Sequence, residues 1–410
     1  MKIVHLIPYF PPLGGEKYVV NLSVGILRLN SSLDVKIIAY KLKSPIVNND
    51  YLIDNLHNAG IDVKYIEGRG PSLAFFNFSE IIKTIIEEKP DILHVHTVAY
   101  PYPLLAYILR KIKYCKETLR RPTIITTFHG VYDFVAFPFR DLSLLLKSVG
   151  NVATIKKMFS SINMFINSTA AVLSSDFIIS VAYSDLPFIN KIMNITGARR
   201  PIRVIHGGVD IIFFSTKWPA KDKIDGNPAI LYIGRLNVEK GIDILFKVLK
   251  ILINRLPDIK LYIVSRDRKN YRIIQKMAKA YGLDNRVILL GEVREKDLPV
   301  LLAKVDMLVQ PSRAEGASLV IMEAMSVGTP IVASSAGDNR IFLSSKRGIL
   351  ADYKNPSDFA YKIEKLYKNK DLMFEISQNA RKFAKRVFNW KVLATRHLNL
   401  YVEVLSDRRS

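Results

Sequence analysis

The chain has very little cysteine. Cys115 is the only cysteine among 410 residues, so no disulfide can form within the chain. A framework of disulfides is therefore excluded as a source of stability, and this usage is typical of proteins from a reducing compartment.

Long uninterrupted apolar runs are also missing. The most apolar stretch, residues 164–183, is broken by Asn167, Ser168 and Asp176 among others, so we expect that it does not span a bilayer. The opening apolar segment reaches Pro8 too early for the core of a signal peptide. These features predict a cytoplasmic protein, either free or peripheral on the cytoplasmic face of a membrane.

Strand-like and helix-like segments alternate along the whole chain. A length of 410 residues exceeds the usual size of one hydrophobic core, so we expect two domains. Alternation of this kind predicts an α/β fold with two doubly wound parallel sheets. The predicted strands are residues 3–7, 35–39, 91–97, 123–127, 177–181 and 203–205, then 229–233, 259–264, 287–290, 306–310 and 330–334.

A polar stretch at residues 217–228 separates the two series and is the predicted interdomain linker. The N-terminal Rossmann-like domain is then 1–216 and the C-terminal one is 229–388. Within the first, Ser79 is the expected N-cap of a helix that runs to Lys89. Other helical patterns cover residues 16–29, 242–256, 357–367, 372–387 and 392–405.

Two carboxylates, Glu315 and Glu323, stand eight positions apart between the strands 306–310 and 330–334. Glu315 is expected in the loop after a strand, and Glu323 on the helix that follows. Backbone N–H groups are free at such a helix start, which suits an anionic group such as phosphate. Open α/β sheets bind their ligands at this edge. The residues expected to supply these N–H groups are Gly316, Ala317, Ser318 and Leu319.

Two cations follow the first strand of the second half. This strand ends at Gly234, Arg235 comes next in the loop, and Lys240 stands before Gly241 at a helix start. Two cations beside a helix start can neutralise a diphosphate. Surface Arg and Lys are common, so the alternative is an ordinary charged surface; the order and spacing relative to Glu315 and Glu323 favour a shared site.

These motifs resemble those of the family 4 glycosyltransferases, which are retaining enzymes with the two-domain GT-B fold. Residues 311–330 carry the resemblance, with Pro-Ser before, Glu-Gly between and Glu-Ala-Met-x-x-Gly-x-Pro after, together with Gly-Arg…Lys-Gly at 234–241. The resemblance implies that Glu323 holds the ribose hydroxyls of a nucleotide sugar. It also implies that Arg235 and Lys240 hold the diphosphate, and that Glu315 holds the transferred sugar.

The resemblance extends to the first half of the chain. Gly14 and Gly15 follow the first strand, where paired glycines let the backbone approach a ligand closely, and the family places a glycine loop that faces the donor there. His129 matches the His-Gly of the family at a strand end, which implies contact with the transferred sugar; an ordinary loop histidine is the alternative. The family's last helix, here within 389–410, is expected to pack back on the N-terminal domain.

His94 and His96 face the same side of one predicted strand, as a pair of metal ligands would. Metal sites need three or four converging ligands, and no Asp, Glu or Cys nearby completes one. The sequence also contains no Asp-x-Asp motif. We therefore expect a metal-independent enzyme with no cofactor, for which the nucleotide-diphosphate sugar is a substrate.

Acidic residues are few, with 37 Asp and Glu against 60 Lys and Arg, which gives a net charge of +23. Such an excess concerns partners rather than fold. Basic residues at 110–121, and Lys147, Lys156 and Lys157 in an apolar stretch, suit the headgroups of an anionic membrane that carries a lipid-linked acceptor. A solvated basic surface is equally consistent. Nucleic-acid binding is disfavoured, because the sequence has no helix-turn-helix, zinc-finger spacing or RNP-like aromatic motif.

The sequence therefore predicts a retaining transferase that moves a sugar from a nucleotide-diphosphate sugar to a glycan or lipid-linked acceptor. A nucleotide-sugar epimerase or hydrolase on the same fold is the nearest alternative, and it needs an acid/base set that the sequence does not identify. The resemblance departs from the family pattern at Ser265–Arg268 and at Arg340, which stands where the family often has a carboxylate. An extra positive charge there would suit an acidic sugar.

Overall fold

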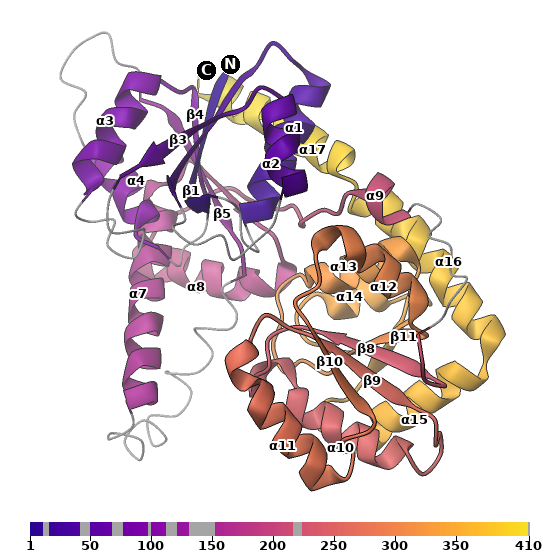
Figure 1. Ribbon diagram of the computed structural model, residues 1–410. Helices are drawn as coiled ribbons and strands as arrows, with labels where there is room; N and C mark the ends of the chain where they lie inside the picture. The colour runs from indigo at the N-terminus through magenta and orange to yellow at the C-terminus, as the bar shows by residue number, and fades with distance from the viewer. Residues whose placement is uncertain are drawn as a thin grey trace. The chain divides into compact units, whose positions relative to one another are not determined.

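The computed structural model describes residues 1–10, 16–41, 50–67, 77–96, 100–111, 121–130, 152–215 and 224–408 (Figure 1). These residues form two compact units. Unit 1 comprises Met1–Gly207 with Trp390–Ser410, and unit 2 comprises Gly208–Asn389. Each unit contains one parallel sheet with helices on both faces, so the predicted α/β class with two doubly wound sheets is confirmed.

Unit 1 is built on a seven-stranded sheet with the order β3-β2-β1-β4-β5-β6-β7. All of its strand pairs are parallel. The order reverses between β1 and β4, and ligands of such sheets bind at the carboxyl ends of the strands beside this point. The strands are β1 (Lys2–Phe10), β2 (Asp34–Lys41), β3 (Asp62–Ile66), β4 (Ile92–His96), β5 (Thr123–Phe128), β6 (Phe177–Ser180) and β7 (Ile202–Val204).

Helix α17 (Trp390–Asp407) belongs to unit 1 although it comes from the far end of the chain. It packs against α1 (Glu16–Leu29), and Figure 1 shows the two helices side by side. Gly25 permits this approach, because a Cβ there would lie 2.9 Å from the Cβ of Ala394. The other described helices of the unit are α2 (Asp50–Asn58), α3 (Phe78–Glu88), α4 (Tyr102–Lys111), α7 (Val152–Ser174), α8 (Leu186–Thr196) and the 3₁₀ helix η2 (Tyr183–Asp185).

Unit 2 is built on a six-stranded parallel sheet with the order β10-β9-β8-β11-β12-β13, which reverses between β8 and β11. Its strands are β8 (Ala229–Ile233), β9 (Lys260–Val264), β10 (Val287–Gly291), β11 (Met307–Gln310), β12 (Ile331–Ser334) and β13 (Ile349–Ala351). The helices are α9 (Ile211–Ser215), α10 (Ile242–Leu252), α11 (Tyr271–Tyr281), α12 (Leu298–Lys304), α13 (Leu319–Val327), α14 (Asn339–Leu343), α15 (Pro356–Lys368) and α16 (Lys370–Val387).

Helices cover both faces of the unit 2 sheet, with α10, α11 and α15 on one face and α12, α13 and α14 on the other (Figure 1). The burial of α10 shows why this segment folds as it does. Ile242, Leu245 and Leu249 recur at helical spacing and are buried, whereas Lys247 and Lys250 are exposed on the opposite side. The apolar stripe therefore determines which face of the helix meets the sheet.

The structure differs from the sequence prediction in several places. Strands β3 and β13 were not predicted, and Ser79 lies inside α3, which begins at Phe78 after Asn77, so the predicted N-cap was wrong. The units divide at Gly207, before the predicted limit at 216, because Val209 and Phe214 pack into the core of unit 2. Residues 217–223 of the predicted linker lie outside the described residues.

Glu88 at the end of α3 is a buried carboxylate that binds three lysines. Its Oε2 lies 2.5 Å from Lys2 Nζ and 3.0 Å from Lys36 Nζ, and its Oε1 contacts Lys64. Burial alone would raise the pKa of the Glu88 carboxyl, but the hydrogen bonds from the three lysines outweigh it and lower this pKa to about 2. The lysines extend from β1, β2 and β3, so this one carboxylate ties three neighbouring strands to α3.

Replacing this carboxylate should destabilise unit 1. A pKa of about 2 against an ordinary value of 4.5 corresponds to about 3 kcal/mol of stability, which is present above pH 4.5 and is lost as pH falls toward 2. We therefore expect Glu88→Gln to lower the free energy of unfolding by about 3 kcal/mol at pH 7, measured by urea denaturation.

The matched control is Glu87→Gln, because the exposed Glu87 forms a long ion pair with Lys83, at 3.9 Å, and does not form an ion pair with any of the three lysines of Glu88. This substitution should change the free energy of unfolding by less than about 0.5 kcal/mol. Equal effects of the two substitutions would contradict the structural role of Glu88.

Candidate active site

Three neighbouring strands of unit 2 bring their carboxyl-terminal loops together. Strand β11 pairs with β8 through Leu308 and Leu231, and with β12 through Gln310 and Ala333. Because the strands are parallel and adjacent, the loops that follow Ile233, Gln310 and Ser334 lie side by side. The sheet order reverses at this place, which is where doubly wound sheets bind ligands.

Two glycines allow the backbones of these loops to touch. A Cβ on Gly241 would lie 2.0 Å from the carbonyl oxygen of Pro311, and one on Gly337 would lie 2.2 Å from that of Glu315. Both glycines have positive φ, 74° and 55°, which disfavours any side chain. The loop at residues 311–318 is thus held between the loops that follow β8 and β12. Gly337 was not singled out by the sequence analysis.

Lys240 and Glu315, both predicted site residues, form an ion pair. Lys240 Nζ lies 2.9 Å from Glu315 Oε2 and donates a hydrogen bond to the carbonyl of Ala314 at 3.3 Å. The other carboxylate oxygen, Oε1, accepts a hydrogen bond from Ser312 Oγ at 2.7 Å. Both charged side chains are mostly buried, with exposed fractions of 16% and 12%. An anionic ligand at this place would meet a cation that is already fixed.

Lys240 owes its position to a short turn. Residues Val238–Lys240 form a 3₁₀ helix (η3), and Asn237 Oδ1 accepts a hydrogen bond from the Lys240 backbone N–H at 3.0 Å. Arg313 braces the same turn from the neighbouring loop. Its guanidinium binds both oxygens of Asp243 at 2.7 Å, and its backbone N–H donates to Glu239 at 2.8 Å. The sequence carried no signal for the role of Arg313.

Arg235 is the more exposed cation of the predicted pair. Its guanidinium is half-exposed and lies 3.6 Å from Glu239 Oε2, which is long for a charge-assisted hydrogen bond. The backbone, in contrast, is fixed, since the Arg235 carbonyl accepts a hydrogen bond from Tyr232 Oη at 2.6 Å. Gly234, at the end of β8, donates to Val264 at 3.1 Å. The backbone that carries this cation is therefore tied to β8 and β9.

Glu323 lies on α13 and is buried, with 6% exposure, so it does not belong to a solvated face of the helix. Helix α13 begins at Leu319, and Ser318 before it makes no side-chain capping hydrogen bond. Gly316 is tied to the loop after β12 through its carbonyl, which accepts from Asp338 at 2.9 Å. Ala317 and Ser318 connect this point to the helix start, so the predicted N–H groups lie between the Lys240–Glu315 pair and α13.

In unit 1, Gly14 and Gly15 lie outside the described residues. His129 follows β5 and is partly exposed. Its Nε2 lies within hydrogen-bond distance of His96 Nδ1, at 3.1 Å. The rings of Tyr18 and His129 form an edge-to-face contact, with a centroid distance of 4.9 Å and an interplanar angle of 86°.

Further histidines continue inward from His96. His96 Nε2 lies 2.9 Å from His5 Nδ1, while His94 contacts Tyr401 Oη at 2.7 Å through Nδ1 and Thr127 Oγ1 at 2.6 Å through Nε2. Strand register explains the grouping, because His5 pairs with His94 across β1 and β4. His397 on α17 belongs to the same group, and its Nε2 lies 2.6 Å from Tyr18 Oη.

No Asp, Glu or Cys was expected to complete a metal site at His94 and His96, and this expectation left out a third histidine. His5 joins them, and one nitrogen from each ring lies within 4.8 Å of the others. Both nitrogens of His94 and both of His96 already have hydrogen-bond partners. This arrangement favours a hydrogen-bonded network over an ion site, and metal independence stays a prediction.

All five histidines of this group are neutral near pH 7. Burial lowers the pKa of His5 to about 3 and the pKa of His129 and His397 to about 4, and it lowers the pKa of His94 and His96 well below the usual range. Neighbouring histidines add to this effect, because a second charge in the group would repel the first. Unit 1 therefore contains a network of histidines that take up no second proton near pH 7.

Part of the expected basic surface is used inside unit 1. Arg110 and Arg121 both bind Asp176, at 2.8 and 2.9 Å, and Arg110 also donates to the carbonyl of Ser174 at the end of α7. Residues 112–120 and Lys147, and the side chains of Lys156 and Lys157, lie outside the described residues. In the described part of the chain, no helix is long and apolar enough to cross a bilayer.

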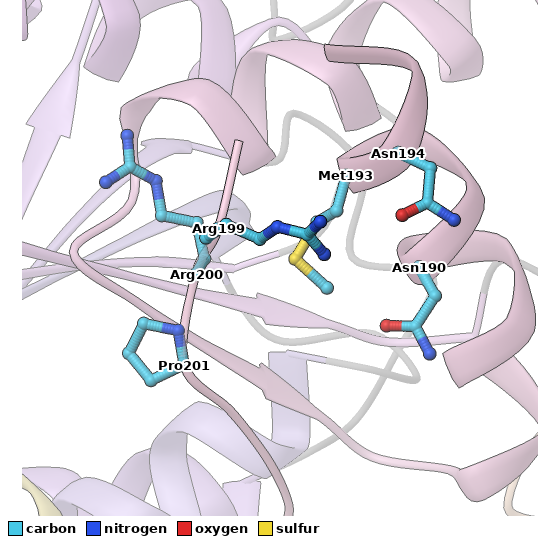
Figure 2. A pocket seen from close by; sticks show the side chains of 6 residues that line it. All are labelled: Asn190, Met193, Asn194, Arg199, Arg200 and Pro201. Atoms are coloured by element: carbon cyan, nitrogen blue, oxygen red, sulfur yellow. The ribbon is translucent and has the colours of Figure 1, made fainter. Parts of the chain in front are cut away.

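A hollow of about 660 Å³ lies between the end of α8 and β7 (Figure 2). Its lining residues are Asn190, Met193, Asn194, Arg199, Arg200 and Pro201. Arg200 is held by hydrogen bonds to the carbonyls of Val172 and Leu173, each at 3.1 Å. None of the predicted site residues lines this hollow, so it is separate from the candidate active site.

Two family models match the chain. The model for glycosyl transferases group 1 matches residues 214–383, and the model for Glycosyltransferase Family 4 matches residues 13–213. An uncharacterized glycosyltransferase of Methanocaldococcus jannaschii is 28% identical over 99% of both chains. The GDP-mannose:cellobiosyl-diphosphopolyprenol alpha-mannosyltransferase of Xanthomonas campestris is 22% identical over 100% of this chain and 99% of its own.

Other relatives match over part of their length only. A second uncharacterized glycosyltransferase of M. jannaschii is 29% identical over 49% of this chain, and the match spans about half of that relative, 53%. Among solved structures, the sucrose-phosphate synthase of Thermosynechococcus elongatus has a TM-score of 0.73 at 17% identity, over 99% of both chains. Anabaena HepE in complex with UDP-glucose has a TM-score of 0.71 at 20% identity, over 99% of this chain and 100% of its own. These structures share the GT-B fold with this chain.

The buried histidines predict a marked acid sensitivity of unit 1. Each has a folded pKa below its unfolded value of about 6.5, so the unfolded chain binds more protons. The stability that depends on neutral histidines is fully present above pH 6.5 and is lost as pH falls toward 4. Between pH 6.5 and 5, where Glu88 stays charged, we expect the free energy of unfolding to fall by more than about 1.4 kcal/mol per pH unit, the slope for one proton.

Urea denaturation across this pH range measures that slope. His57→Gln should leave it unchanged, because His57 is exposed on α2 and lies outside the network. His5→Asn should make the slope shallower, whatever it does to the stability at pH 8. A slope of one proton or less in the unmodified protein would show that the histidines are not kept neutral.

Proposed function

Since this chain belongs to the group 1 and family 4 glycosyltransferases, we propose that it uses a nucleotide-diphosphate sugar as donor, retains the anomeric configuration and needs no metal ion. The observation that carries the proposal is the fixed Lys240–Glu315 pair, 2.9 Å apart, beside the start of α13 at the switch point of the unit 2 sheet. A cation and a carboxylate held together suit a donor whose diphosphate is joined directly to a sugar with several hydroxyl groups.

In this proposal Lys240 and Arg235 neutralise the diphosphate. When the bond between the sugar and the phosphate oxygen breaks, negative charge grows on the departing diphosphate, and a cation fixed beforehand stabilises that charge most effectively. Lys240 is such a fixed cation, and Arg235 supplies a second cation that is more exposed. Backbone N–H groups at Ala317–Leu319, at the start of α13, add further donors for the phosphate oxygens.

Two carboxylates position the rest of the donor. Glu323 is buried on α13 and accepts hydrogen bonds from the ribose hydroxyls, and Glu315 accepts them from the transferred sugar. Ser312 and Lys240 orient the two Glu315 oxygens, so this carboxylate is preorganised for hydroxyl groups at a defined angle. His129 of unit 1 contacts the transferred sugar. The acceptor hydroxyl replaces the diphosphate at the same face of the sugar, and its proton passes to the departing phosphate.

For the acceptor we propose a glycan or lipid-linked glycan at the cytoplasmic face of a membrane. The net charge of +23 supports an anionic surface as a partner. The X. campestris relative is named for a diphosphopolyprenol acceptor and a GDP-mannose donor, while Anabaena HepE was solved with UDP-glucose. Arg340 is exposed beside the loop after β12 and is a candidate for selecting the sugar.

The first prediction of this proposal is selective binding of one nucleoside diphosphate. Thermal-shift measurements on the full chain with UDP, GDP, ADP, dTDP and CMP, in the presence of a chelator, should show a shift with one diphosphate. A ligand at 100 times its Kd stabilises the folded state by about 2.7 kcal/mol. Arg235→Ala and Glu323→Gln should each reduce or abolish this shift.

Arg272→Ala is the matched control, because Arg272 is an exposed cation on α11 and not part of the site. It should keep the shift of the unmodified protein. Once the donor is known, Arg235→Ala and Lys240→Ala should lower turnover by about 10²-fold or more. Binding that survives all three site substitutions would contradict the proposed donor site, and binding that requires a divalent ion would contradict metal independence.

The second prediction concerns the membrane. The full chain should sediment with vesicles that contain anionic phosphatidylglycerol at low ionic strength, and the bound fraction should fall as salt is raised from 50 to about 500 mM, where screening shortens the range of the charges. Neutral phosphatidylcholine vesicles serve as the control. Equal binding to both kinds of vesicle, or no effect of salt, would contradict an electrostatic association.

A further inference from the structure

A chain of hydrogen bonds runs inward from His129 and ends inside unit 1. His129 Nε2 meets His96 Nδ1 at 3.1 Å, and His96 Nε2 meets His5 Nδ1 at 2.9 Å. The remaining nitrogen, His5 Nε2, is buried and has no hydrogen-bond partner in the described part of the chain. The three rings therefore form a line with one partly exposed end, at His129, and one closed end, at His5.

The positions of the hydrogens along this line depend on one another. A neutral imidazole carries one N–H and one lone pair, so a ring that donates at one nitrogen accepts at the other. Each contact in the line needs one donor and one acceptor. Once the hydrogen of His5 is placed, those of His96 and His129 follow, and only two arrangements of the whole line exist.

The closed end decides between the two arrangements. If His5 carried its hydrogen on Nε2, a buried N–H would have no acceptor, which is among the rarest defects of protein interiors. With the hydrogen on Nδ1, His5 donates to His96 Nε2 and leaves only a lone pair unpaired. His96 then carries its hydrogen on Nδ1 and donates to His129 Nε2. The hydrogen of His129 is consequently on Nδ1.

Neighbouring groups do not disturb this line. His397 Nδ1 lies 2.7 Å from the carbonyl of Leu393, which can only accept, so His397 carries its hydrogen there and its Nε2 accepts from Tyr18 Oη. The Tyr18 hydroxyl is thus committed to His397, and the Tyr18 ring packs against the His129 ring at an interplanar angle of 86°. His94 has its own two partners, Tyr401 and Thr127, and takes no nitrogen of His96.

We propose that His96, backed by His5, is a positioning residue that fixes His129 as a hydrogen-bond donor through Nδ1. This inference rests on the proposed function, in which His129 contacts the transferred sugar. It deepens that function, because a ring fixed in this tautomer donates to an oxygen of the sugar or of the leaving group and does not remove a proton from the acceptor. Nδ1 of His129 has no partner among the described residues, so it is available for this contact.

Because the three rings are neutral, the hydrogens along the line keep one arrangement. Burial lowers the pKa of His5, His96 and His129, so none of the three rings takes up a second hydrogen near pH 7. A charged His129 would donate from both nitrogens and would lose its contact with the donating Nδ1 of His96. The second nitrogen of a histidine sets the role of the first, as in other proteins in which a buried partner selects the tautomer.

The direct test is nitrogen NMR of the ligand-free full chain with ¹⁵N-labelled histidine, near pH 7.5. The chain has seven histidines, so single substitutions assign each signal. We expect a protonated Nδ1 and an unprotonated Nε2 for His5, His96 and His129. Protonated Nε2 at His129 would overturn the inference. This measurement needs no substrate, so it stands whether or not the proposed activity is found.

A pair of substitutions tests the consequence for transfer. His96→Asn supplies an amide N–H at the place of Nδ1, whereas His96→Asp has the same shape and only accepts, which forces the hydrogen of His129 onto Nε2. With the donor found by thermal shift, turnover of the Asn variant should exceed that of the Asp variant by about 10²-fold, the effect of one preorganised donor. Equal turnover in two folded variants would overturn the inference.

One outcome separates the two proposals. If NMR shows His129 with its hydrogen on Nδ1 but His129→Leu transfers sugar as well as the unmodified protein, the tautomer is established and the role of His129 at the sugar is wrong. If the Asp variant does not fold, the NMR result on the unmodified chain still decides the inference.

Discussion

The candidate donor site depends on the close contact of three backbone loops. The loop at 311–318 fits between its neighbours only because residues 241 and 337 have no side chains: a Cβ at either position would overlap a carbonyl oxygen, of Pro311 or of Glu315. Because Gly241 and Gly337 have no side chains, Lys240, next to Gly241, can reach Glu315 on the neighbouring loop. The charged pair is therefore a product of backbone packing, and its rigidity comes from the sheet beneath it rather than from the charges.

This constraint also explains how far the sequence could predict the site. Glu315, Glu323, Arg235 and Lys240 all follow short apolar strands, in the loop or in the helix that comes next, so local patterns placed them after the carboxyl ends of parallel strands. The contact of Gly337 with Glu315 is between segments that are distant in sequence, and no local pattern reports it. Arg313 was missed for the same reason, because its partner Asp243 lies seventy positions earlier.

The limits of the fold prediction have similar causes. Strand β13 has three residues, too few for any periodicity, and β3 at the sheet edge has mostly exposed or half-buried side chains, so neither stands out from its surroundings. The histidine network needed the register of β1 and β4, which pairs His5 with His94. Charge was the least specific signal. Arg110, Arg121 and the three lysines around Glu88 contribute to the net charge of +23 but stabilise unit 1 from within.

Helix α17 connects these observations, because it closes the histidine network from the end of the chain. His397 and Tyr401 lie one turn apart on this helix and contact Tyr18 and His94, and Gly25 on α1 provides the space for the approach. The rings behind His129 are therefore enclosed in part by a helix that follows unit 2 in the sequence. Burial is what keeps these rings neutral, so the state of His129 depends on a helix that follows the donor site in the sequence. The two units have separate hydrophobic cores, but the role proposed for His129 in unit 1 requires α17, which the chain supplies only after unit 2.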